Sequence, residues 1–279
     1  MMVAEKKAAG EAGGSRMTDI RVMEKKQNLL RFVIKNYDTA YVNTLRRLIL
    51  DEVPVMAIED VEFRKNDSIL YDEVVAHRLG LLPLLTDLKG YNLPEKCTCK
   101  GKGCAKCQLE LSLKTEAQGV ITASKIKSKD PKVKPIYGDM PITKLTEGQQ
   151  LEFVATAVLG KGKEHAKWVP GLAFFRNMPR VEIAKGSESY ESVKKCPKNV
   201  FEIKDKRIVV ANLLDCDMCM ACVEACSDNS IKVEDEENQF IFTVESFGQL
   251  SPKDMVVQAA AEFDQKLDEF RELIKKEAD

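Results

Sequence analysis

Four of the nine cysteines of this 279-residue chain form the short run Cys216-Asp-Met-Cys219-Met-Ala-Cys222-Val-Glu-Ala-Cys226. The first three have the C-x2-C-x2-C spacing that holds iron–sulfur clusters, because one loop can then wrap three corners of a cubane. The fourth thiolate must come from a distant segment, and Cys196, which is followed by proline, is the candidate. The pattern predicts one 4Fe–4S cluster, with a 3Fe–4S form as the alternative, bound by Cys196, Cys216, Cys219 and Cys222.

A two-cluster ferredoxin would carry three more cysteines before Cys196, but those positions hold Gly186, Ser189 and Ser192. The segment therefore resembles a ferredoxin with one cluster deleted, and Cys226 is left over. A subdomain of roughly fifty residues buries little apolar surface and usually needs a metal or disulfide as a cross-link. A structural cluster is one interpretation; electron transfer or redox sensing is the other.

A second cysteine group has the spacing C-x-C-x4-C-x2-C and consists of Cys97, Cys99, Cys104 and Cys107. Four thiolates within eleven residues, with glycines that allow the chain to turn, fit a tetrahedral zinc ion. The alternatives are two disulfides or a site that has lost its metal.

The charge balance of the chain is close to neutral, with 43 Lys and Arg against 44 Asp and Glu and a pI near 6.3. A protein that grips DNA through its own surface usually has a basic excess, so any role with DNA or RNA is expected to be indirect. We find no signal peptide and no run of eighteen apolar residues. The composition therefore predicts a cytoplasmic protein without a membrane segment, and residues 1–16 are expected to form a flexible tail.

Periodicity predicts a mixed α+β chain. Strands are expected at Leu29–Ile34, near Ile58–Phe63, at Leu151–Leu159 and at Phe240–Val244, and helices at Asp38–Leu50 and Asp72–Leu81. The segment Lys125–Lys134, which is rich in lysine and contains Pro131, is expected to be a mobile surface loop.

A long C-terminal helix is predicted to begin at Ser251-Pro252, where Asp254 can close a capping box, and to run to about Lys276. Its apolar residues recur in steps of four, three, four, three and four, the period of a coiled-coil seam, at Val256, Ala260, Phe263, Leu267, Phe270 and Ile274. This pattern favours a partner helix; packing on the chain's own sheet is the alternative.

No catalytic constellation is recognisable. The only histidines, His77 and His165, stand in different segments and are expected to serve in packing or in an interface. The stretch Gly160-Lys-Gly-Lys163 is a short basic loop that lacks the pattern of a phosphate-binding loop. We therefore predict that this chain has no active site of its own.

Several blocks, in order along the chain, resemble one family. These blocks are Asn43–Pro54, Asp72–Pro83, Glu164–Pro170 and Phe242–Pro252. They are similar to the alpha-type assembly subunits of DNA-directed RNA polymerase, in the archaeal and eukaryotic branch. The inserted iron–sulfur segment is similar to that of the archaeal D-type members.

This resemblance implies a discontinuous dimerisation domain (17–57 and 236–279), an inserted mainly-β domain with the cysteine-rich loop (58–180) and a ferredoxin-like Fe–S domain (181–235). It also implies pairing with subunit L and a platform for small subunits N and P and the large B-type polypeptide, with the nucleotidyltransferase active site in the large subunits. Asn43, Arg46 and Arg47 would contact neighbouring subunits, as would His77, Arg78 and His165. A ferredoxin-like electron carrier or redox-sensing subunit is the competing hypothesis.

Overall fold

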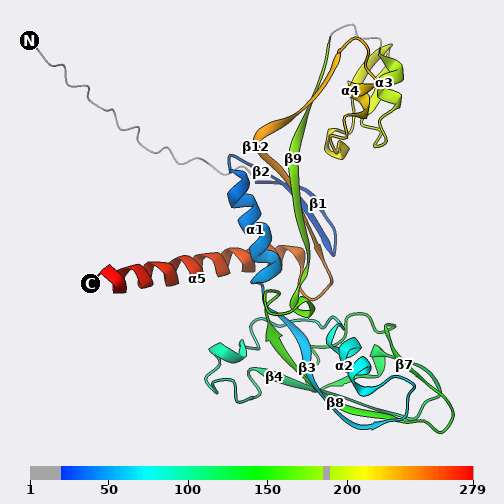
Figure 1. Cartoon of the computed structure of the whole chain (residues 1–279), viewed down its shortest axis with the longest axis vertical. Helices are drawn as coiled ribbons and strands as arrows, with labels where there is room; N and C mark the ends of the chain where they lie inside the picture. Colours follow the sequence, from blue (N-terminus) through cyan, green and yellow to red (C-terminus); the bar gives the residue numbers. More distant parts are fainter. Residues whose placement is uncertain (1–19, 185–188, 279) are drawn as a thin grey trace, which may run out of the picture. The chain divides into compact units, whose positions relative to one another are not determined.

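The computed structural model describes residues 20–184 and 189–278, so the predicted tail and Gly186 lie outside the described residues. The helices are α1 (Thr39–Asp51), α2 (Asp72–Gly80), α3 (Tyr190–Lys194), α4 (Ala221–Glu224) and α5 (Pro252–Ala278) (Figure 1). The strands are β1 (Ile20–Lys25), β2 (Leu29–Lys35), β3 (Val55–Asn66), β4 (Gln108–Thr115), β5 (Gly119–Thr122), β6 (Lys127–Ser128), β7 (Pro141–Leu145), β8 (Leu151–Gly160), β9 (Gly171–Ile183), β10 (Phe201–Lys204), β11 (Arg207–Val210) and β12 (Ile231–Ser246). Single 3-10 turns are η1 (Pro94–Lys96), η2 (Ala123–Lys125), η3 (Ala166–Trp168) and η4 (Leu213–Asp215). The predicted α+β class is confirmed.

The strands form two four-stranded sheets, in the orders β1-β2-β12-β9 and β3-β8-β4-β6, and two pairs, β10-β11 and β5-β7. The described residues separate into two compact units. One unit comprises 20–21, 32–39, 176–184 and 189–241; the other comprises 22–31, 40–175 and 242–278. The domain boundaries expected at 180/181 and 235/236 fall within the continuous strands β9 and β12.

The core of the larger unit lies on the sheet that β3, β8 and β4 form. Along β8 alternate residues are buried, from Leu151 to Leu159, as expected when successive side chains point to opposite faces of a sheet. Helix α2 adds Val75 and Leu79, both fully buried, to the same core. The predictions of a strand at Leu151–Leu159 and a helix from Asp72 are confirmed.

The prediction of a mobile loop at Lys125–Lys134 is wrong. Strand β6 within this segment pairs with β4, and Ile126 and Val133 are 8% and 0% exposed in the main core. The reason is that two apolar side chains, each flanked by exposed lysines, anchor the segment to the sheet. Lysine-rich composition describes only the solvent face of this segment.

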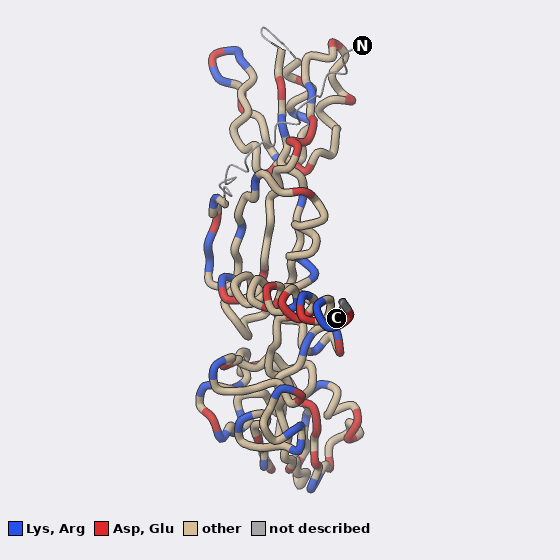
Figure 2. Tube along the Cα trace, turned by 90° about the vertical axis from the view of Figure 1, so that its left-hand side faces the viewer, with Lys and Arg blue, Asp and Glu red and all other residues tan. Residues whose placement is uncertain are grey.

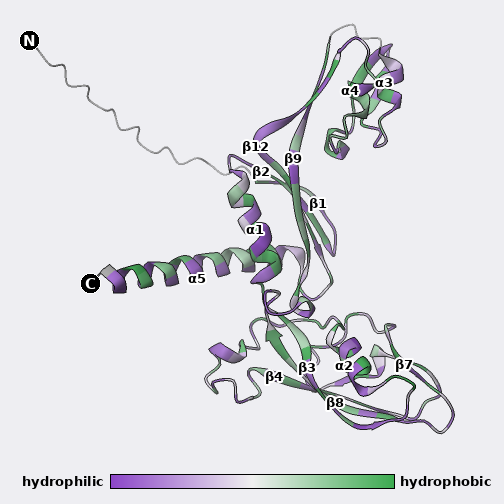
Figure 3. Cartoon of the chain, viewed as in Figure 1, coloured by the Kyte–Doolittle hydropathy of each residue, from purple (hydrophilic) through white to green (hydrophobic). Residues whose placement is uncertain are grey.

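Helix α5 begins as predicted. The backbone N–H of Asp254 donates to Ser251 Oγ (3.2 Å), and the Ser251 hydroxyl donates to Asp254 Oδ2 (2.6 Å). The helix is amphipathic along its length (Figure 3) and carries acidic and basic residues between its apolar ones (Figure 2). No helix among the described residues is long and apolar enough to cross a membrane.

Replacement of Val133 tests the anchored segment. Val133→Ser removes a fully buried side chain and adds a hydroxyl without a partner, so we expect the free energy of unfolding to fall by about 2–3 kcal/mol. The matched control Lys134→Ser changes an exposed neighbour and should shift it by less than about 0.5 kcal/mol. Urea unfolding followed by circular dichroism measures both; equal values would mean that the segment is not packed.

Candidate metal centres and assembly surface

The first cysteine group folds into a compact loop between η1 and β4. The Sγ atoms of Cys97, Cys99, Cys104 and Cys107 all lie within 4.8 Å of one another. Three of the Sγ–Sγ distances are 3.6 Å (Cys97–Cys104), 3.5 Å (Cys99–Cys107) and 3.8 Å (Cys104–Cys107). A tetrahedral ion with metal–sulfur bonds of about 2.3 Å holds its sulfurs about 3.8 Å apart, so the geometry fits a single metal ion.

The backbone of this loop explains how four sulfurs meet within so few residues. Lys100, Gly101 and Gly103 have positive φ angles of 54°, 76° and 86°, which reverse the chain twice. A side chain at Gly103 would clash with the Gln108 amide. The backbone N–H of Cys104 donates to Cys107 Sγ (3.3 Å), a contact that favours the thiolate.

The thiols differ in their readiness to ionise. Hydrogen bonds, chiefly with the Cys107 thiol, lower the pKa of Cys99 to about 6, whereas burial raises the pKa of Cys107 to about 12. Cys97 and Cys107 are buried while Cys99 and Cys104 are partly exposed. A bound cation would favour the thiolate form of the buried Cys107.

The second cysteine group lies in the smaller unit. Cys216 and Cys222 are 8% and 6% exposed and share one cluster with the half-buried Cys196, while Cys219 is exposed. Burial, followed by the nearby charge of Cys196, raises the pKa of the Cys222 thiol. The charges of Cys216 and Cys219 act on Cys222 in the same direction. Cys196, distant in sequence, therefore packs against the same cluster as Cys216 and Cys222.

Two features shape the loop that carries this run. Met218 and Met220 have φ angles of 55° and 63°, a left-handed conformation that non-glycine residues rarely adopt. Arg176 of β9 donates hydrogen bonds to the carbonyl oxygens of Leu214 and Cys216 and ties the start of the loop to that strand. The sequence gives no local signal for Arg176, which lies about forty residues from its acceptors.

Cys226 packs in the same buried cluster as Cys216 and Cys222, but its sulfur contacts other side chains. Its Sγ lies 2.8 Å from Asp228 Oδ1, 3.4 Å from Ser230 Oγ and 3.6 Å from Ser189 Oγ. Ser189 occupies one of the positions where a two-cluster ferredoxin would have a ligand, and Ser192 Oγ donates to the carbonyl of Ala225 (2.8 Å). Cys226 and Ser189 are therefore hydrogen-bonded to each other, and Ser192 is hydrogen-bonded to the backbone.

The residues of the predicted apolar seam of α5 become more exposed toward the C-terminal end of the helix. Val256 and Phe263 are half-buried, while Ala260 is exposed. Further along, the exposed fractions are 45% for Leu267, 60% for Phe270 and 52% for Ile274. Leu273, 60% exposed, extends the stripe; sequence reasoning missed it because it falls outside the strict four-three alternation.

Helix α1 presents the predicted polar residues. Arg46 is half-buried, and its Nε donates to Asn43 Oδ1 (3.0 Å). Arg47 is exposed, 3.9 Å from Asp51 Oδ2.

The two histidines come together although they are far apart in sequence. His77 and His165 line one surface pocket of about 200 Å³, with Ile58, Gly80 and Lys167 on its wall. His165 Nδ1 accepts the backbone N–H of Lys167 (3.0 Å), which leaves Nε2 as the ring nitrogen without that contact. Local periodicity in the sequence could not predict that these two histidines would line the same pocket.

The sequence of the chain matches a family model and several named proteins. Residues 58–170 match the model of the RNA polymerase Rpb3/RpoA insert domain. The DNA-directed RNA polymerase subunit Rpo3 of Methanosphaera stadtmanae is 38% identical, over 93% of this chain and 99% of its own length. Subunit Rpo3 of Thermococcus kodakarensis is 34% identical, over 94% of this chain and 100% of its own length.

The chain belongs to the Rpo3 family. The predicted family resemblance is therefore confirmed. The matched insert domain contains the four-cysteine loop and both histidines. Helix α5 and the second cysteine group lie outside that domain.

The four-cysteine loop of this Rpo3-family chain is expected to hold one metal ion. Elemental analysis of the purified chain should give one zinc ion per chain, counted apart from any iron, and Cys97→Ser should release it because three ligands leave the coordination sphere open. Thr98→Ala, in the same loop, is the control and should retain the ion. A metal content that Cys97→Ser leaves unchanged would disprove the site.

Proposed function

We propose that this chain is a non-catalytic assembly subunit of archaeal DNA-directed RNA polymerase, which pairs with subunit L through α5. The observation that carries the proposal is the exposed apolar stripe of Leu267, Phe270 and Ile274. The heterodimer would be the platform for small subunits N and P and the large B-type polypeptide in the cytoplasm. DNA, RNA and the nucleotidyltransferase chemistry would belong to the assembled complex.

Physical chemistry supports a protein partner for this stripe. Covering exposed apolar surface is favourable by about 25 cal/mol for each Å² removed from water. A continuous row of large apolar side chains on an exposed helix therefore favours a binding partner. The spacing along α5 is the one that lets two helices interlock side chains. A second helix of similar amphipathic character would cover the row.

Helix α1 supports a second contact surface of the same platform. The hydrogen bond from Arg46 to Asn43 holds a guanidinium that still has further donors to offer. Arg47 is exposed beside it. We assign Asn43, Arg46 and Arg47 to contact with a neighbouring large subunit, and the pocket of His77 and His165 to contact with a neighbouring subunit.

For the metals, we propose a zinc ion on Cys97, Cys99, Cys104 and Cys107, and one 4Fe–4S cluster on Cys196, Cys216, Cys219 and Cys222. The close sulfurs of the first loop suit a single tetrahedral ion. The second group, in which one ligand comes from a separate segment, suits a cluster that takes each thiolate on a different iron. We assign the cluster a structural role, as the cross-link of a ferredoxin-like domain (181–235).

The comparisons give no support to the alternative of a ferredoxin-like electron carrier. The matched relatives are polymerase subunits, and the alignments cover nearly their whole length.

The pairing through α5 has a direct test. Leu267→Glu with Phe270→Glu places two charges in the stripe, and we expect binding to subunit L to weaken by at least about a hundredfold, since burying an unpaired charge costs several kcal/mol. Lys276→Glu, on the polar side of the helix, is the control and should bind normally. Isothermal titration calorimetry with purified subunit L gives the affinities; unchanged binding by the double variant would refute the pairing.

The proposed cluster ligands can be tested by iron content, with a substitution of Cys226 as the control. Anaerobically purified chain should contain four irons in the cluster, and Cys216→Ser should lose them because a buried ligand is removed. Cys226→Ser should keep all four, since Cys226 contacts Asp228 and the nearby serines instead. Iron analysis with electron paramagnetic resonance distinguishes these results. Equal iron in both variants would contradict the ligand set.

A further inference from the structure

The loop Gly160-Lys161-Gly162 is tightly packed, against the end of α1 on one side and against Trp168 on the other. A side chain at Gly160 would clash with the Trp168 ring, and one at Gly162 with the carbonyl oxygen of Leu50. The backbone N–H of Lys163 also donates to the carbonyl of Asp51 (3.0 Å). The two glycines therefore allow a close approach that directs the Lys161 side chain inward.

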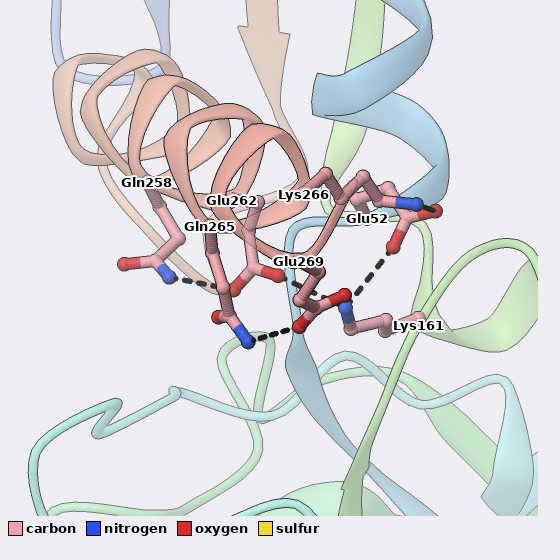
Figure 4. A network of polar contacts seen from close by, with 7 residues as sticks. All are labelled: Glu52, Lys161, Gln258, Glu262, Gln265, Lys266 and Glu269. Atoms are coloured by element: carbon pink, nitrogen blue, oxygen red, sulfur yellow. Dashed lines mark hydrogen bonds and ion pairs between the residues drawn. The ribbon is translucent and has the colours of Figure 1, made fainter. Parts of the chain in front are cut away.

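Lys161 lies at the centre of an ionic network (Figure 4), of which Lys266, 44% exposed, is the one clearly exposed member. Its ammonium is 3.0 Å from Glu52 Oε2, at the end of α1, and 2.9 Å from Glu262 Oε2, on α5. The other oxygen of Glu52 is 2.7 Å from Lys266, one turn further along α5. The side chains of Lys161, Glu52 and Glu262 are 14%, 11% and 10% exposed.

The network depends on Lys161 for its charge balance. Two ammonium groups and two carboxylates neutralise one another. Burial alone would lower the pKa of Lys161, but its hydrogen bonds to Glu262 and Glu52 raise it. Without Lys161, Glu52 would keep its pair with Lys266, whereas Glu262 would keep the Gln258 amide but no ammonium, so the two carboxylates would repel each other.

The position of the network along α5 matters. The buried residues of this helix are Pro252, Met255, Ala259 and Glu262, and from Asp264 to Glu277 every residue is exposed. Ile274 lies twelve residues beyond Glu262, about 18 Å at 1.5 Å per residue. A change of about 10° at Glu262 would therefore move Ile274 by about 3 Å, enough to disturb the side-chain packing of a helix pair.

We propose that Lys161 is a positioning residue, which fixes the direction in which α5 leaves the protein and so presents the apolar stripe at the angle its partner requires. The effect on assembly rests on the proposed pairing with subunit L. The effect on the direction of α5 is independent of that pairing, because every group in the network belongs to this chain.

The first measurement tests direction in the full chain alone. Spin labels attached through p-acetylphenylalanine in place of Lys144 and Lys276 leave the nine cysteines untouched. Double electron–electron resonance should give a narrow distance distribution for the parent chain and for Lys161→Arg, and a broader or shifted one for Lys161→Met. Lys163→Met, which removes the same charge from an exposed lysine in the same loop, should match the parent.

The second measurement tests assembly. Lys161→Met should weaken binding to purified subunit L by about tenfold or more, although no residue of the stripe has changed. Lys161→Arg and Lys163→Met should bind as the parent does. If Lys161→Met does not fold, the variant Lys161→Met with Glu262→Gln replaces it, because it removes the repulsion and leaves Glu52 paired with Lys266.

The outcomes separate the two ideas. An unchanged distance distribution in Lys161→Met overturns the positioning role. A changed distribution with unchanged affinity overturns its consequence for assembly. If the parent chain itself fails to bind subunit L, the proposed function fails, while the distance measurement still decides the role of Lys161.

Discussion

The attachment of α5 is the constraint on which the proposed assembly surface depends. This helix of 27 residues is buried only along its first three turns, where Met255 and Ala259 are its fully buried apolar residues. Such a small apolar contact does not fix a direction, because apolar surfaces attract without preference for angle. The charged groups at Glu52, Lys161 and Glu262 supply the missing directionality, since each ion pair is also a hydrogen bond with a preferred geometry.

The core of the smaller unit contains few apolar residues. Its buried cluster consists of Val193, Val200, Ile231 and Val233 together with three cysteines, Cys216, Cys222 and Cys226. Two of those cysteines belong to the proposed cluster ligands, so the same side chains would serve as core and as metal ligands. Folding and metal binding would then be one process, because a bound metal contributes the stability that apolar burial cannot.

Sequence reasoning succeeded where the interactions are local and failed where they are long-range. The start of α5 could be predicted because Ser251 and Asp254 are three residues apart, and the four-cysteine loop because its ligands are close in sequence. Lys161 contacts Glu52 and Glu262 across more than 100 residues in each direction, and no periodicity encodes such a meeting. The pocket shared by His77 and His165 was missed for the same reason.

The burial of a lysine with two carboxylates is difficult to explain by stability alone. Well-packed apolar side chains of similar volume are often as stabilising as a buried ion pair, because desolvation offsets most of the Coulomb attraction. A leucine in place of Lys161 could fill the space, but it would not distinguish one rotation of α5 from the next. Gly162 lets the loop pack against the Leu50 carbonyl of α1, and Gly160 lets it pack against the Trp168 ring, so the backbone adds a constraint to the ionic one. Such a costly arrangement is understandable if the direction of the helix, rather than the free energy of folding, is what the network provides.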